Sequence, residues 1–264
     1  MRILTFSVLR NCKLKSALLK NLSVEVSHAK SEIDKLSDPN LLEILPTWKE
    51  DEEVELRSAV LKQMRVLPNF LTEEEEAALL GEVEPQLKRM RYEYDHWDNA
   101  IEGYRETERE QWNAQNSATL ARVRAVAFPA HAQLLPHAHV LDLAPAGYIR
   151  PHVDAVRFCG DTIAGLCLLS SAVMRLAHAE RAHLALDALL PRRCLYVMTG
   201  VARYSFSHAV LGGERSAWRG ARVPRRRRVA VISRERPAPQ AAPQAAPQAA
   251  PRAARDTDGT VTTT

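Results

Sequence analysis

The sequence predicts an α+β fold that is mainly β, with helices in the N-terminal half and a sheet after residue 139. Beyond that point, short apolar or alternating runs are separated by turn residues, as in "HVLDLAPAG", "TIAGLCLLS" and "RRVAVISR". Short strands at this spacing are typical of a β sandwich or barrel. The 264 residues are 46% hydrophobic and 26% charged, which fits one substantial globular domain with tails.

The two ends of the chain differ in composition from the middle. Residues 1–21 are basic, contain no acidic residue and are interleaved with apolar residues, which predicts a mitochondrial presequence; the alternative is an amphipathic surface helix. Residues 22–63 are predicted to be a linker or extension, and residues 64–236 the folded domain. Residues 237–264 consist largely of an Ala-Pro-Gln-Ala repeat with little to bury, so we expect a disordered tail.

Helices are predicted at two places before the strands. Thr72 followed by Glu75 forms a capping-box pattern at the start of "TEEEEAALL", where acidic residues also suit the first turn of a helix. Residues 100–128 are mixed and charged, and we expect them to be helical as well.

Composition also limits the class of protein. The formal net charge of +4 is too small to indicate nucleic-acid binding by itself. The four cysteines have no metal-like or disulfide-like spacing, so we expect free thiols in a reducing compartment. No apolar run approaches the roughly 18 residues that a membrane span requires.

A metal site is indicated by "GYIRPHVD", where His152 and Asp154 are two residues apart. Residues at this spacing project from the same side of a strand, so both side chains can reach one ion. A third ligand is available in "ARYSFSHAVL", where a strand would place His208 on one face with Tyr204 and Phe206. Two histidines and one carboxylate, with open positions on the metal, form the site of non-haem Fe(II) oxygenases. His137 and His139 have no carboxylate at a suitable offset and are expected to be structural, while Arg203 is expected to be a structural ion-pair partner.

The last predicted strand supports an anionic co-substrate. In "RRVAVISR", Arg228, Ala230, Ile232 and Arg234 share one face. Guanidinium groups that face inward across an apolar strand are costly unless an anion pairs with them. A carboxylate matches the guanidinium fork, so a dicarboxylate that binds the metal at one end can meet an arginine at the other.

The order of these motifs over residues 64–236 resembles the AlkB-type 2-oxoglutarate- and Fe(II)-dependent dioxygenases, and within them the mitochondrial members. The resemblance implies a double-stranded β-helix (jelly-roll) core with flanking N-terminal helices. It places the iron ligands on His152, Asp154 and His208 and the 2-oxoglutarate-binding residues on the following three positions: Tyr196, Arg228 and Arg234.

One departure concerns the strand before the metal motif. Many members carry Asn-x-Tyr there, which helps to hold 2-oxoglutarate, whereas this chain has "LDL", Leu141 to Leu143. We therefore expect Tyr196 to be more important for binding the co-substrate.

The resemblance implies an enzyme of the mitochondrial matrix that uses Fe(II), 2-oxoglutarate and O₂, connected with fatty-acid metabolism and programmed necrosis. The chain lacks a recognisable nucleotide-recognition lid, so we expect hydroxylation of a protein by a monomeric enzyme. The alternatives are demethylation of mitochondrial RNA and an iron- and 2-oxoglutarate-binding regulatory module with little turnover. Arg222 and Arg225 to Arg227 are expected to form a solvated loop, although they could also hold RNA phosphates or an acidic protein face.

Overall fold

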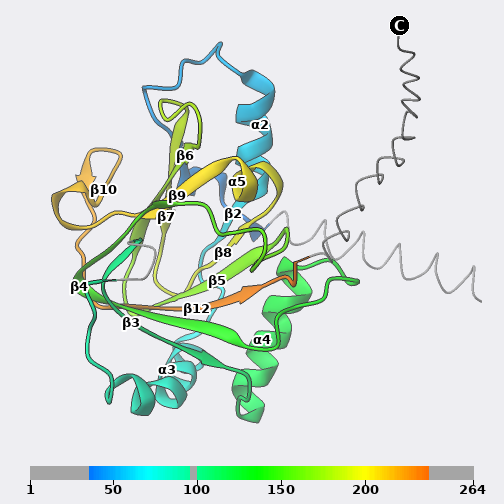
Figure 1. Ribbon diagram of the computed structural model, residues 1–264, viewed down its shortest axis with the longest axis vertical. Helices are drawn as coiled ribbons and strands as arrows, with labels where there is room; N and C mark the ends of the chain where they lie inside the picture. Colours follow the sequence, from blue (N-terminus) through cyan, green and yellow to red (C-terminus); the bar gives the residue numbers. More distant parts are fainter. Residues whose placement is uncertain (1–35, 96–99, 238–264) are drawn as a thin grey trace, which may run out of the picture.

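The computed structural model describes residues 36–95 and 100–237, and its centre is one curled antiparallel sheet (Figure 1). The predicted presequence and nearly all of the predicted tail lie outside these residues. The strand order is β1-β7-β6-β9-β4-β12-β5-β8-β2, with β3 added along β4. The strands are β1 (Leu42–Ile44), β2 (Met64–Leu67), β3 (Ile101–Arg109), β4 (Ala138–His152), β5 (Ile163–Leu168), β6 (Ala172–His178), β7 (Ala185–Leu190), β8 (Leu195–Met198), β9 (Phe206–Val210) and β12 (Arg228–Arg234).

The long strand β4 turns this sheet into two facing layers. Its first half pairs with β12, with Leu143 opposite Arg228 and His139 opposite Ile232. Its last part pairs instead with β9, where His152 lies opposite His208. One strand therefore belongs to both layers, as in a jelly roll, and the end of β4 reaches the space between them.

Two hydrophobic cores lie on opposite faces of β12. Ala230 and Ile232 point into the core between the two sheet layers, whereas Val229 and Val231 point into a second core. That second core is covered by the helices α3 (Glu73–Leu87) and α4 (Ala114–Ala127), which lie together along one side of the sheet (Figure 1). Successive side chains of β12 therefore point to opposite sides of the sheet, as predicted from the sequence.

The predicted helix start at Thr72 is confirmed. Thr72 Oγ1 accepts a hydrogen bond from the Glu75 amide at 3.1 Å, and the Glu75 side chain accepts one from the Thr72 amide at 2.9 Å. These reciprocal bonds satisfy two amides that the first turn leaves without helical partners. Glu76 belongs to the same acidic run, Glu73 to Glu76, but its side chain is buried and accepts a hydrogen bond from Arg192. The run is therefore not exposed to solvent along its whole length.

The prediction of one helical stretch over residues 100–128 is wrong in its first part. Ile101–Arg109 forms β3, and only Ala114–Ala127 is helical. Charged residues occur on both sides of β3 because each side has partners elsewhere in the fold: Arg105 pairs with Asp142 on one side, and Glu106 with His139 on the other. These pairs conceal the apolar alternation by which a strand is recognised.

Residues 36–63 differ from the linker or extension that we expected. A short 3₁₀ helix, η1 (Pro39–Leu41), leads into β1, which pairs with β7. The helix α2 (Val54–Gln63) follows, and Trp48 and Val60 are both buried in the core between the sheet layers. This part of the chain therefore completes one sheet layer rather than preceding the domain.

The segment before His208 also differs from the expectation. Tyr204 does not lie on the strand but ends a short helix, α5 (Gly200–Tyr204), and its side chain is 44% exposed. Gly200, with φ of +49°, allows the chain to turn into this helix, and β9 begins only at Phe206.

The remaining elements lie between β9 and β12. They are the 3₁₀ helix η2 (Gly213–Arg215) and a hairpin of β10 (Ala217–Trp218) and β11 (Ala221–Arg222). None of the helices in the described ranges has the length and apolar character needed to cross a membrane.

Candidate active site

Three residues from two distant parts of the chain converge at the end of β4. Ligand-type atoms of His152, Asp154 and His208 all lie within 4.8 Å of one another. Asp154 Oδ1 is 3.3 Å from His152 Nε2 and 3.7 Å from His208 Nε2. His152 is the last residue of β4, so Asp154 belongs to the following loop rather than to the strand as expected. The two imidazoles meet because their strands are paired at this position.

The electrostatic environment keeps Asp154 and His208 in the forms that bind metal ions. Burial alone would raise the pKa of Asp154, but its hydrogen bond to His152 and the charge of Arg234 hold that pKa well below its usual range. Burial, reinforced by the neighbouring His152, lowers the pKa of His208 to about 3. A carboxylate and a neutral imidazole are the forms that coordinate a metal ion.

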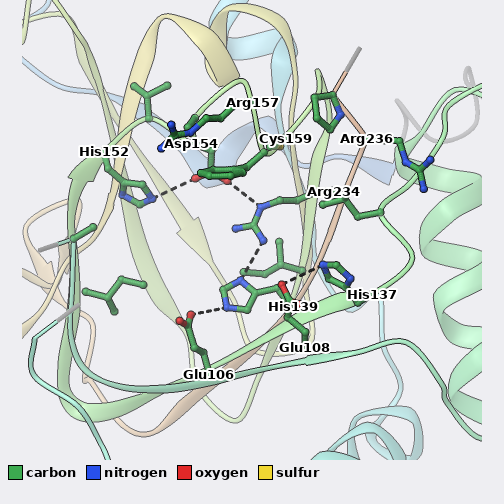
Figure 2. Close-up of a pocket in the computed structure, with 18 of the residues that line it drawn as sticks. Glu106, Glu108, His137, His139, His152, Asp154, Arg157, Cys159, Arg234 and Arg236 are labelled. Carbon is green, nitrogen blue, oxygen red and sulfur yellow. Dashed lines mark hydrogen bonds and ion pairs between the residues drawn. The ribbon is translucent and has the colours of Figure 1, made fainter. Parts of the chain in front are cut away.

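Arg234 connects Asp154 to two further residues. Its Nε donates to Asp154 Oδ2 at 2.9 Å, and its Nη1 lies 3.1 Å from His139 Nδ1. The other ring nitrogen of His139 lies 2.7 Å from Glu106 Oε2. Figure 2 shows this chain of contacts running from Asp154 through Arg234 and His139 to Glu106. His139 was expected to be structural, and the sequence offered no signal for its contact with Arg234.

Arg228 lies deeper in the site and lacks a carboxylate partner in the described residues. Its side chain is only 2% exposed, and its Nη2 donates to the Cys167 sulfur at 3.1 Å. Its Nε is buried without a hydrogen-bond partner in the described part of the chain. A buried guanidinium with an unsatisfied N–H is costly, so this arginine is suited to an anion that enters from outside.

All six sequence-predicted residues border a single inner cavity of about 50 Å³. They are His152, Asp154, Tyr196, His208, Arg228 and Arg234. The two arginines approach it from one face of β12, and Tyr196 reaches it from β8. Leu141 also borders it, so the "LDL" segment contributes an apolar wall.

Tyr196 is held in place by a glycine on the neighbouring strand. Gly165 lies directly opposite Tyr196 in the β5–β8 pair, and a Cβ at residue 165 would come within 2.4 Å of the tyrosine ring. The ring therefore occupies the space that any larger residue at 165 would need. Burial raises the pKa of Tyr196, so its hydroxyl stays protonated and able to donate.

Cys167 is a site residue that the sequence did not reveal. It is fully buried beside Arg228 and Cys194. A hydrogen bond from Cys194 and the charge of Arg228 lower the pKa of Cys167. Cys159, close to the metal motif in sequence, is buried too, and burial raises the pKa of its thiol.

Of the four arginines expected to form a solvated loop, three have separate partners. Arg227 pairs with Asp142 and Glu84, and Arg222 with Glu214. Arg225 is half-buried, donates to the Gly147 carbonyl at 3.1 Å and has its pKa lowered to about 10 by burial and the charge of Arg228. Arg222 and Arg226 are exposed as expected, whereas Arg225 and Arg227 are partly buried.

Arg203 is structural, but not through the ion pair that we expected. Its side chain is 2% exposed and donates to the carbonyls of Cys159 and Gly160 at 3.1 and 3.2 Å. It therefore fixes the loop that follows Asp154.

A wide outer cavity of about 1140 Å³ opens above the His152–Asp154 motif. On one side it is bordered by the loop after β4, where the side chain of Phe158 is 54% exposed. Arg157 lies over that ring, with its guanidinium carbon 4.6 Å from the ring centroid. Arg236 borders the same cavity (Figure 2), so the rim offers an aromatic surface and positive charges beside the candidate metal site.

Comparisons with known proteins identify relatives that are named for a dioxygenase activity. No family model matches the chain. It is 53% identical over 184 residues to the "Alpha-ketoglutarate-dependent dioxygenase alkB homolog 7, mitochondrial" of Mus musculus, and 50% identical over 184 residues to that of Bos taurus. Each alignment covers 68% of this chain and 83% of the relative.

A solved structure supports the fold independently of close sequence similarity. The Pseudomonas putida prolyl-4-hydroxylase matches with a TM-score of 0.50 at 17% identity, covering 70% of this chain and all of that chain. The jelly-roll expectation is therefore confirmed, and the relatives are named for one activity and one compartment. The chain belongs to the mitochondrial AlkB-type family of α-ketoglutarate-dependent (2-oxoglutarate-dependent) dioxygenases.

Proposed function

We propose that His152, Asp154 and His208 hold the Fe(II) of this dioxygenase and that Arg228, Arg234 and Tyr196 bind 2-oxoglutarate. The observation that carries the proposal is the single cavity bordered by all six, with the unsatisfied Nε of Arg228 at its inner end. When bound, Fe(II) with 2-oxoglutarate and O₂ supplies the oxidation, in which 2-oxoglutarate becomes succinate and CO₂ while a substrate C–H bond is hydroxylated.

The protein residues contribute binding, orientation and exclusion of water. Arg234 holds Oδ2 of Asp154, which leaves Oδ1 on the side of the two imidazoles. Arg228 pairs with the far carboxylate of 2-oxoglutarate, and the Tyr196 hydroxyl donates to the same end. Leu141 and its apolar neighbours keep water from competing for these charge-assisted bonds.

The finer proposal is hydroxylation of a protein in the mitochondrial matrix by a monomeric enzyme. Its support is the outer cavity, which is wide and open enough to admit a folded loop or an extended peptide. All six candidate residues come from one chain, so the site needs no second copy. By resemblance, the proposed reaction is connected with fatty-acid metabolism and programmed necrosis, and residues 1–21 are proposed as the presequence.

Demethylation of mitochondrial RNA is a second candidate. The exposed Phe158 ring, with Arg157 over it, is a surface on which a base can stack. The arginine run argues against this candidate, because Arg225 and Arg227 bind within the protein. The regulatory module remains a third candidate, in which the cofactors bind with little turnover.

The metal assignment is tested by replacing His152 with alanine. We expect the His152→Ala protein to lose iron-dependent conversion of 2-oxoglutarate to succinate, measured as succinate released per enzyme. His183→Ala is the matched control, because His183 is a surface histidine that pairs with Glu52 away from the cavity. Undiminished succinate formation by the His152→Ala protein would reject the assignment.

The substrate is tested by mass spectrometry of matrix proteins and RNA after incubation with the active enzyme or the His152→Ala protein. A mass increase of one oxygen on a protein supports protein hydroxylation, and loss of methyl groups from RNA supports the second candidate. Succinate release that no matrix extract stimulates supports the regulatory module.

A further inference from the structure

We infer that His139, itself oriented by Glu106, is a positioning residue that fixes Arg234 against Asp154. This inference rests on the proposed function, in which Asp154 is a metal ligand and Arg234 meets 2-oxoglutarate. It assigns a role to two residues that the metal and co-substrate motifs do not contain.

The hydrogen-bonding capacities of the three side chains define one arrangement. A guanidinium can only donate, so His139 Nδ1, 3.1 Å from Arg234 Nη1, must accept. The neutral ring then carries its proton on Nε2, which donates to Glu106 Oε2 at 2.7 Å. Each neighbour of His139 therefore requires the same tautomer.

This arrangement restricts the direction in which Arg234 donates. The guanidinium is planar, so anchoring Nη1 on His139 also sets the direction of the Nε–H bond. That bond meets Asp154 Oδ2 at 2.9 Å, and the other oxygen, Oδ1, faces His152 at 3.3 Å. His139 thereby determines which carboxylate oxygen is presented to the metal.

Three adjacent strands supply the members of this chain of contacts. Glu106 belongs to β3, His139 to β4 and Arg234 to β12, while Asp154 follows the end of β4. His139 lies opposite Ile232 of β12 in the sheet, two residues before Arg234. Side chains mounted on paired strands are held more accurately than those on loops, which suits a positioning role.

A second histidine–glutamate pair in the same cavity provides a comparison. His137 Nε2 lies 3.1 Å from Glu108 Oε1, and both residues border the outer cavity (Figure 2). Within the residues that the structure describes, this pair makes no hydrogen bond to Arg234. A substitution at His137 therefore reproduces the loss of a histidine from the cavity without disturbing Arg234.

The test uses three variants of the full chain. His139→Leu removes the acceptor for Arg234, His139→Asn keeps an amide oxygen near the position of Nδ1, and His137→Leu is the matched control. Mn(II), which does not support turnover, serves as the metal probe. Its binding is measured by electron paramagnetic resonance, and 2-oxoglutarate binding to the Mn(II)-loaded protein is measured by calorimetry.

We expect His139→Leu to weaken Mn(II) and 2-oxoglutarate binding by about tenfold, the lower end of the effect of residues that orient metal ligands. His139→Asn should recover most of this loss, and His137→Leu should bind as the wild type does. Thermal unfolding of each variant shows whether the fold is retained. Wild-type binding by His139→Leu, an equal loss in His137→Leu, or no recovery in His139→Asn would overturn the inference.

A measurement without metal separates this inference from the proposed function. Hydrogen exchange at the Arg234 Nε–H, followed by ¹⁵N NMR in the metal-free protein, should be faster in His139→Leu than in the wild type. An unchanged exchange rate overturns the positioning role. By contrast, equal Mn(II) binding by the wild type and the His152→Ala protein would reject the metal assignment and leave the effect on Arg234 still measurable.

Discussion

Arg227 and Arg228 are adjacent in the chain, yet their side chains lie in two regions with opposite electrostatic character. Arg227 lies on the side of the sheet that faces α3, where its Nε donates to Asp142 at 3.0 Å and its Nη2 to Glu84 at 2.7 Å. Those two carboxylates raise the pKa of Arg227. Arg105 also donates to Asp142, at 2.8 Å. In this outer region, each of these charged side chains therefore has a partner of opposite charge within the chain.

In the inner region, Arg228 has no carboxylate partner among the described residues. Its Nη2 meets only a cysteine sulfur, and its Nε has no partner within the described residues. Burial would lower the pKa of Arg228, but the neighbouring Cys167 and Tyr196 raise it, so the charge is retained.

The difference teaches how to distinguish two uses of buried arginine. A guanidinium satisfied by carboxylates of its own chain contributes to the fold, because breaking the pair leaves a buried charge. A guanidinium that is buried but unsatisfied weakens the fold until an external anion arrives. The second kind indicates a ligand site where the unsatisfied arginine also borders a cavity, as Arg228 does. Arg203 and Arg225 also have buried N–H groups without a partner among the described residues, but they do not border the inner cavity.

The largest expected effect comes from removing the inner charge. Arg228→Met should raise the KM for 2-oxoglutarate by about 100-fold, since a buried partner of a bound anion is lost. The ligand-free protein should unfold at an equal or higher temperature, because methionine fills a similar volume without a charge. Steady-state succinate assays and thermal unfolding measure the two effects. An unchanged KM would contradict the assignment of Arg228.

The outer arginine should show the reverse behaviour. Arg227→Met should lower the free energy of unfolding by about 2 kcal/mol, less than for a fully buried pair because Arg105 still holds Asp142. The KM for 2-oxoglutarate should stay unchanged. Urea unfolding and the same succinate assay test this pair of expectations. A KM increase equal to that of Arg228→Met would remove the distinction between the two regions.

The smallest expected effect comes from displacing the Tyr196 ring in the inner cavity. In Gly165→Ala, the new Cβ would displace the Tyr196 ring, and the KM for 2-oxoglutarate should rise about fivefold through loss of one hydrogen bond. Gly81→Ala in α3 is the control, because a Cβ there meets nothing within 4 Å. If both variants keep the wild-type KM, Tyr196 does not contribute to binding of the co-substrate.

Much of the candidate site could be predicted from the sequence because five of its six residues lie in regular strands, Asp154 being the exception. The alternation of "RRVAVISR" places Arg228 and Arg234 on the inner face, and the structure has them there. The capping box at Thr72 was equally readable, since the atoms that form it are three residues apart. Local sequence patterns therefore predicted three features. They are the start of the helix at Thr72, the two faces of β12 and the residue types available for a metal site.

Other features were decided only by the tertiary structure. β3 was misassigned because its charges are balanced by residues from other elements, such as Asp142 for Arg105. Arg227 looked solvated, but it pairs with Glu84, which is 143 residues away in the sequence. His139 was set aside, although Arg234 lies 95 residues further along the chain and within hydrogen-bond distance.

The physical reason is that burying a charge depends on its partner, and a local pattern contains no information about partners from distant strands. The sequence determined which side chains face inward on β12. The closing of the two sheet layers through β4 decided which side chains meet one another, and that Arg228 borders the inner cavity with an Nε left unsatisfied by the described residues.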